Sequence, residues 1–432
     1  MPTRRAFLGH VFLAAGAGAG AVGAATRNVE AAARINVDLA AHPGTAEDLE
    51  GDEAFWAEAG RAFTVDRSIV NLNNGGVSPA IGAAQASMKR HLDFSHQCPA
   101  HNMWNVLEPR REDVRKGLAS QWGVAAGEIA ITRNASESLQ ICQFGMDLRK
   151  GDEVLTTTQD YPRMIHTYQQ RSRREGIRLT QIGIPVPAED DAEIVRRFER
   201  AITDRTRVIL MCHMVNLTGQ ILPVRAVVAM ARRRGIPVIV DGAHALAHFD
   251  FSLGDLECDY YGTSLHKWLF APHGTGLLYV RREKIGDLWP LMAAPESNGD
   301  DIRKFEQIGT HPAANTLAIA ESLDFHRALG PRRKEARLIF LRDYWARRLS
   351  EHPRTRLHTS LQPGRACGIA NVAVDGIAPG AIADRLWREH RILVAGIGHP
   401  ECPGVRVSPS VYTTRQELDR FCDAMMKIIG RS

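Results

Sequence analysis

Residues 207–244 read RVILMCHMVNLTGQILPVRAVVAMARRRGIPVIVDGAH, and the apolar pattern of this stretch changes its period twice. Residues 207–212 form a short apolar run that predicts a buried strand. Residues 223–234 have the spacing of an amphipathic helix, and residues 236–240 form a second apolar run. A strand, a helix and another strand in this order indicate a βαβ unit, whose two strands lie parallel in one sheet.

The same alternation extends from about residue 120 to residue 280. It predicts further strands at 129–133, 153–157 and 178–184, with helices at 136–147, 162–175 and 191–202. We therefore expect an α/β fold with a mostly parallel central sheet.

Beyond Pro290 the pattern changes. A long helical stretch covers about 312–352 and is broken near Gly330 and Pro331. A smaller α+β unit follows, with strands expected at 368–374 and 391–395 and a last helix at 414–429. These patterns divide the chain into a signal peptide (1–25), an N-terminal arm (26–60), a large domain (61–305), and a long helix with a small C-terminal domain (306–432).

The N-terminus has the composition of an export signal. Arg4 and Arg5 are followed by Phe7 and Leu8, and then by a weakly apolar stretch rich in Ala and Gly. This arrangement resembles a bacterial twin-arginine signal, which implies export through the Tat machinery to the periplasm. The alternative is an Ala-rich tail with a chance arginine pair. No other apolar run is long enough to span a membrane, so we expect a soluble mature protein.

Charge and cysteine content exclude several classes of function. The net charge is only +5, and no block of Lys and Arg has interleaved aromatic residues, which argues against binding to nucleic acid. The seven cysteines form no CxxC pair, and no cluster has the spacing of metal ligands. We expect neither a disulfide framework nor a metal centre.

Ligands of an open parallel sheet bind beyond the carboxyl ends of its strands. Ala135 and Ser136 follow the strand expected at 129–133 and open a helix, so their backbone N–H groups could hold a phosphate. Asn216 follows the strand at 207–212 and could donate to a cofactor oxygen. Taken singly, a plain helix cap and a turn asparagine explain these residues equally well.

Asp241 and Lys267 give a sharper indication. Asp241 ends a very apolar strand, where a carboxylate is costly to bury unless it is paired, and a pyridinium nitrogen would pair it. Lys267 follows in the sequence Ser264-Leu-His-Lys-Trp268. A lysine in a closed apolar site has a lowered pKa and can form an imine, whereas the alternative is a solvated surface lysine.

The ordered set of phosphate loop, Asn, Asp-x-Ala-His and Ser-x-His-Lys resembles the class V aminotransferase family of fold-type I pyridoxal-phosphate enzymes. The resemblance covers about residues 65–430. Within the family, the segments Asn73-Asn74-Gly75-Gly76 and Tyr161-Pro162 resemble the isopenicillin N epimerase-like branch.

The resemblance implies a role for each matching residue. Lys267 would be the Schiff-base lysine and the base at Cα, and Asp241 would pair with the pyridinium nitrogen of pyridoxal 5'-phosphate. Tyr161 would stack on the ring. Asn216 and His244 would lie near the phenolic oxygen, while Ala135, Ser136, Ser264 and His266 would hold the phosphate.

Two further residues extend the resemblance. Gly309-Thr310 resembles the segment that reaches the phosphate of the neighbouring subunit, which implies a homodimer. Arg406 resembles the arginine that binds the substrate carboxylate, a task that suits a bidentate guanidinium.

The chemistry expected is reaction at the α-carbon of an amino acid or peptide-derived amine, and these residues leave racemisation, transamination and elimination open. A cysteine desulfurase or C–S lyase is the alternative, with Cys402 as its nucleophile, although the loop that carries Cys402 is short and Tyr161 replaces the histidine of that branch. A non-catalytic binding protein is a third possibility that no residue supports. The candidates for a substrate pocket are His96, His101, Trp104 and Asn105, and packing residues are the equal alternative.

Overall fold

The structure is a computed structural model that describes residues 34–430. The expected signal peptide and the first part of the arm lie outside the described residues. A seven-stranded sheet forms the centre of the large domain, in the order β2-β8-β7-β6-β5-β3-β4. Only β8 runs against its neighbours. The strands are β2 (Ile129–Thr132), β3 (Glu153–Thr157), β4 (Arg178–Ile182), β5 (Thr206–Cys212), β6 (Val238–Asp241), β7 (Tyr260–Ser264) and β8 (Gly276–Val280). The prediction of an α/β fold with a mostly parallel sheet is confirmed.

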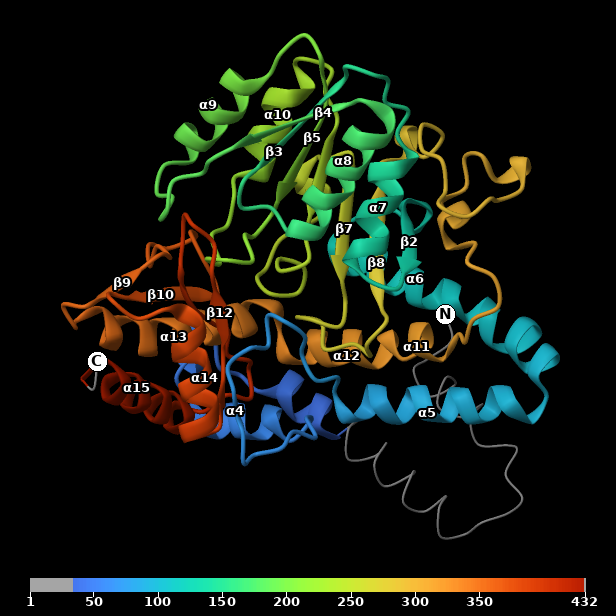
Figure 1. Ribbon diagram of the computed structural model, residues 1–432. Coiled ribbons are helices and arrows are strands. Elements are labelled where there is room, and N and C mark those ends of the chain that lie inside the picture. Colours follow the sequence, from blue (N-terminus) through green and yellow to red (C-terminus); the bar gives the residue numbers. More distant parts are fainter. Residues whose placement is uncertain (1–33, 431–432) are drawn as a thin grey trace.

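Helices cover both faces of this sheet (Figure 1). They are α7 (Ala135–Gly145), α8 (Pro162–Glu175), α9 (Asp191–Ala201) and α10 (Val224–Arg232). The strand side chains alternate between the two faces: Val208 packs in the cluster of α7 and α8, whereas Ile209 packs in the cluster of α9 and α10. Burial on both faces explains why the strands are continuous apolar runs in the sequence.

A second unit is formed by the C-terminal part of the chain. Its antiparallel sheet has the order β12-β13-β10-β9. The strands are β9 (Thr355–Leu357), β10 (Ala370–Val374), β12 (Ala395–Ile397) and β13 (Gly404–Val407), and the helices are α13 (Pro331–Ser350), α14 (Pro379–His390) and α15 (Arg415–Gly430). Trp345 and Phe421 pack edge to face in its core. The break in the helical stretch near Gly330 and Pro331 is confirmed, since α12 (Ile319–Leu329) ends there.

The N-terminal part of the chain contributes to this second unit. Strand β1 (Val70–Asn71) lies within the range expected for the large domain, but it pairs in parallel with β11 (Ile392–Leu393). Its apolar side chains explain the placement, because Val70 and Leu72 are fully buried in the core of the C-terminal unit. A two-residue strand is too short to show a period in the sequence.

The remaining elements surround the two sheets, and α5, α11 and α12 form a layer beneath the large sheet (Figure 1). The helices are α3 (Ala46–Leu49), α4 (Glu53–Gly60), α5 (Gly82–Gln97), α6 (Arg111–Trp122) and α11 (Ala314–Leu317). A π-helix, η1 (His101–Leu107), and short 3₁₀ turns, η2 (Glu108–Arg110), η3 (Ala126–Glu128), η4 (Gly254–Leu256), η5 (Arg282–Lys284), η6 (Glu296–Asn298) and η7 (Ile302–Glu306), complete the list. Among residues 34–430, no helix has the length and apolar character required to cross a bilayer.

Candidate active site

A cavity of about 430 Å³ lies at the carboxyl ends of the parallel strands. Segments that follow β2, β3, β5, β6 and β7 all contribute to its wall. Nine of the residues singled out from the sequence line it: Ala135, Ser136, Tyr161, Asn216, Asp241, His244, Ser264, His266 and Lys267. Residues from five strand ends meet here because parallel strands all end at the same edge of the sheet.

Lys267 and His244 form the centre of the site. Lys267 Nζ lies 3.1 Å from His244 Nε2, within hydrogen-bonding distance. Burial lowers the pKa of Lys267 to about 8, although the Asp241 carboxylate opposes this shift. Burial also holds the pKa of His244 well below its usual value, so the imidazole is neutral. The lysine amine is therefore far easier to deprotonate than an amine in water.

Asp241 lies at the end of β6 and is almost fully buried. Its Oδ1 accepts a hydrogen bond from the backbone N–H of Ala243 at 3.0 Å. Burial raises the pKa of Asp241 to about 6, so the carboxyl group is mostly ionised at neutral pH. A buried carboxylate with one neutral hydrogen bond favours a positively charged partner.

The N-terminus of α7 faces the same cavity, since Asn134, Ala135 and Ser136 line it. Asn134 caps the helix by accepting from the Glu137 N–H at 2.9 Å. Ser264 Oγ accepts from the Ala135 N–H at 2.9 Å and ties the helix to the end of β7. The close approach requires Gly276 on β8, where a Cβ would come within 2.6 Å of the Asn134 nitrogen. A helix N-terminus held in this way suits a phosphate.

Arg406 lies on β13, is buried, and contacts Asn216. Its Nη1 donates to the Asn216 carbonyl at 3.0 Å, and its Nη2 donates to Asn73 Oδ1 at 2.8 Å. Burial lowers the pKa of Arg406 to about 10, which leaves the group charged at neutral pH. The sequence offered no reason to place Asn73 beside Arg406, because the contact joins residues more than three hundred positions apart.

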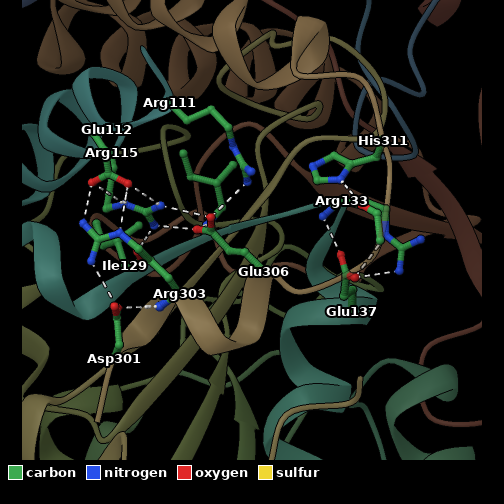
Figure 2. A network of polar contacts seen from close by, with 12 residues as sticks. Arg111, Glu112, Arg115, Ile129, Arg133, Glu137, Asp301, Arg303, Glu306 and His311 are labelled. Carbon is green, nitrogen blue, oxygen red and sulfur yellow. Dashed lines mark hydrogen bonds and ion pairs between the residues drawn. The ribbon is translucent and has the colours of Figure 1, made fainter. Parts of the chain in front are cut away.

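Six predicted residues do not line this cavity, and the first of them is Arg406, which reaches it only through Asn216. Thr310 is exposed and does not line the cavity of its own chain. Its segment is anchored by Glu306, whose carboxylate accepts from Arg115 Nη1 at 2.5 Å, Arg111 Nη2 at 2.9 Å and the Ile131 N–H at 2.6 Å (Figure 2). None of the four candidate substrate-pocket residues lines the cavity either: His96, His101, Trp104 and Asn105.

Unpartnered polar atoms show what the cavity lacks. Asn216 Oδ1 and His244 Nδ1 are both buried and have no hydrogen-bond partner within residues 34–430. Leaving such atoms unpaired is costly, so a polar molecule bound in the cavity would satisfy them. The donor set fits pyridoxal phosphate: a helix N-terminus for the phosphate, a carboxylate for a ring nitrogen and an amine for the aldehyde.

The family model described as Aminotransferase class-V matches residues 73–421. The protein belongs to the class V aminotransferase family. Isopenicillin N epimerase from Streptomyces clavuligerus is 31% identical over 87% of this chain and 99% of its own length. The corresponding enzyme from Amycolatopsis lactamdurans is 28% identical over 86% of this chain and 98% of its own length. Cysteine desulfurase from Pectobacterium atrosepticum is 25% identical over 80% of this chain and 88% of its own length.

Solved structures share the fold of this class V enzyme. Cysteine desulfurase from Escherichia coli superimposes with a TM-score of 0.75 at 19% identity, over 87% of this chain and 98% of that chain. A variant of C-DES, a cystine C–S lyase, with glycine covalently linked to its PLP cofactor superimposes with a TM-score of 0.73 at 22% identity, over 83% of this chain and 98% of that chain. The family and the site together identify the cofactor of this class V enzyme as pyridoxal 5'-phosphate.

Proposed function

We propose that this class V enzyme acts at the α-carbon of an amino acid or peptide-derived amine and inverts its configuration, as an epimerase does. The observation that carries the proposal is the pairing of Lys267, a buried base with its pKa lowered to about 8, with Arg406, a buried cation without a carboxylate partner in the described part of the chain. Arg406 is hydrogen-bonded to Asn216, which lines the same cavity as Lys267, so a base and a cation for a carboxylate are available to one α-amino acid.

The residues divide the work. Arg406 binds the substrate carboxylate and thereby orients the α-carbon. The bound cofactor supplies an electron sink that acidifies the Cα–H bond, and the ionised Asp241 keeps the ring nitrogen protonated. Lys267 Nζ takes the Cα proton, and His244 Nε2 holds that nitrogen in place when it is not bound to the cofactor. Lys267 retains the proton that it has taken, and a proton from solvent delivered to the opposite face of Cα gives the epimer.

The cysteine desulfurase alternative receives less support. A desulfurase needs a reactive cysteine near the substrate, yet Cys402 is fully buried and does not line the cavity. Burial raises the pKa of the Cys402 thiol to about 12, which suppresses the nucleophilic thiolate. The isopenicillin N epimerases also exceed the cysteine desulfurases in identity and in shared length.

The test is isotope exchange in heavy water. The holoenzyme is incubated with a panel of amino acids and short peptides without any oxo acid. The products are separated by chiral chromatography, and their deuterium content is measured by mass spectrometry. Deuterium at Cα together with both enantiomers supports epimerisation. Stoichiometric release of an oxo acid would replace the proposal with transamination, and release of sulfide or of another β-substituent would replace it with elimination.

We also propose export by the Tat pathway to the periplasm and a homodimeric active unit. The Arg4-Arg5 pair supports export, and the exposure of Thr310 away from its own cavity supports a role in a neighbouring site. Fractionation of cells that lack Tat function tests the first, since the protein would then remain in the cytoplasm. Light scattering tests the second, because a monomer that retains full activity contradicts it.

A further inference from the structure

Asn73 is held in a fixed position beside the strand that carries Arg406. Its backbone forms a parallel bridge with Ser408, two residues after Arg406. The Asn73 N–H donates to Asn71 Oδ1 at 3.0 Å, and the following Asn74 N–H donates to the Ser408 carbonyl at 3.1 Å. The side chain of Asn73 therefore starts from a backbone that has little freedom to move.

The amide of Asn73 has one half engaged and one half free. Its Oδ1 accepts from Arg406 Nη2 at 2.8 Å, which turns Nδ2 away from the guanidinium. Within residues 34–430, no group accepts a hydrogen bond from Nδ2. Two N–H donors next to a buried arginine are thus available to a ligand.

Gly76 places this amide next to a residue of the cavity lining. A Cβ added to Gly76 would lie 3.3 Å from Asn73 Nδ2 and 3.3 Å from Asn73 Oδ1. Gly76 itself lines the cavity, and because it has no side chain, no side chain of residue 76 separates the amide from the cavity. Asn216 also lines the cavity, and its carbonyl accepts from the other terminal nitrogen of the Arg406 guanidinium.

We propose that Asn73 is a second substrate-binding residue of the carboxylate site. Its Oδ1 fixes Arg406, and its Nδ2 donates to one oxygen of the substrate carboxylate, so that charge and geometry come from two different chain segments. Asparagine suits the position because it orients the guanidinium without neutralising it; an aspartate would form an ion pair and repel the substrate. The inference rests on the proposed function, which supplies an amino acid as substrate.

The experiment uses two probes that carry no Cα–H bond and therefore cannot be epimerised: 2-aminoisobutyrate and its carboxamide. Each is titrated into the holoenzyme, and the dissociation constant is read from the change in cofactor absorption. We expect the wild-type enzyme to prefer the carboxylate. In Asn73→Asp, the dissociation constant of the carboxylate probe should rise by more than about 100-fold. The dissociation constant of the carboxamide probe should stay unchanged or fall, so that the preference between the two probes is reversed. In Asn73→Ala, the dissociation constant of the carboxylate probe should rise by about 10-fold.

Matched variants complete the design. Asn298→Asp makes the same chemical change at a distance from the cavity and should leave both dissociation constants unaltered. Gly76→Ala crowds the Asn73 amide without removing a polar group. It should raise the dissociation constant of the carboxylate probe and leave that of the carboxamide probe unchanged. If Asn73→Asp fails to fold, Asn73→Ala and Gly76→Ala carry the test.

The outcomes separate the two proposals. An unchanged preference in the Asn73 and Gly76 variants overturns the role of Asn73 and leaves the proposed function intact. A wild-type enzyme that binds both probes equally shows that no carboxylate site exists, and that result overturns the proposed function as well.

Discussion

The side-chain nitrogens of Lys267 and His244 lie 3.1 Å apart inside a buried site. A buried lysine beside a neutral imidazole has no anion in direct contact, so its charged form is unfavourable. The pKa of Lys267 is lowered to about 8 for this reason. The pair keeps a reactive amine available near neutral pH.

Cofactor capture should report this pKa. Only the neutral amine attacks an aldehyde, so lowering the pKa of Lys267 moves its reactive range to lower pH. We expect the rate at which the cofactor-free protein takes up pyridoxal phosphate to rise with pH and to level off above a midpoint near 8. Stopped-flow absorption measures it. A midpoint near the ordinary lysine value of about 10.4 would contradict the burial effect.

Replacement of Lys267 by alanine should remove both covalent attachment and the base. We expect Cα exchange to fall by at least about 1,000-fold, the scale of losing an acid–base group. Borohydride reduction followed by peptide mass analysis should then find no cofactor on residue 267, whereas the wild-type peptide carries it. Lys284→Ala, at a partly exposed lysine of η5, is the control and should change neither result.

Asp241→Asn should lower the rate of Cα exchange without loss of bound cofactor. The amide keeps the shape of the side chain but cannot stabilise a protonated ring nitrogen. We expect a loss of about 100-fold or more in Cα exchange, comparable to removing one preorganised electrostatic group. Cofactor content should remain near that of the wild-type enzyme, since the phosphate site at α7 is unaltered. Full activity with asparagine would show that Asp241 does not act on the ring nitrogen.

Cys402→Ser should leave Cα exchange within about twofold of the wild-type rate, because the thiol is buried outside the cavity. The same variant tests the competing activity. Loss of sulfide release from cysteine in Cys402→Ser, with sulfide release present in the wild-type enzyme, would identify the protein as a desulfurase.

Glu306→Gln should destabilise the protein strongly. Arg115 is almost fully buried and has Glu306 as its nearest carboxylate, so the substitution leaves a buried cation short of its main partner (Figure 2). We expect the free energy of unfolding to fall by about 3 kcal/mol. Glu112→Gln is the comparison. Because the Glu112 side chain is one-third exposed, this substitution should lower the free energy of unfolding by about 1 kcal/mol or less. Urea denaturation measures the free energy of unfolding of both variants. Equal losses would contradict the larger contribution that we assign to the buried Glu306.

The sequence predicted the large domain better than the connections between domains. The strand at 153–157 and the helix at 162–175 were predicted with their observed ends, because each has a strong period and a clear boundary. The last helix, expected at 414–429, spans Arg415–Gly430. The helix over Gly82–Gln97 was not predicted, since its buried residues are few and small and give almost no apolar stripe.

The site was predictable where each residue follows a strand and unpredictable where distant segments meet. The cavity-lining places of Asp241 and Lys267 follow from the strands that precede them. The contact of Asn73 with Arg406 depends on packing that no local period records.

The pairing of β1 with β11 also sets an order of events during synthesis. Val70 cannot pair until Ile392 has been synthesised, 392 − 70 = 322 residues later. The cavity-lining segments that follow the strands of the large sheet end at Lys267, so they can assemble while the ribosome is still producing the C-terminal third of the chain. Asn73 meets Arg406 only after that third has folded. We therefore expect a nascent chain to acquire its cofactor pocket before it can recognise a carboxylate.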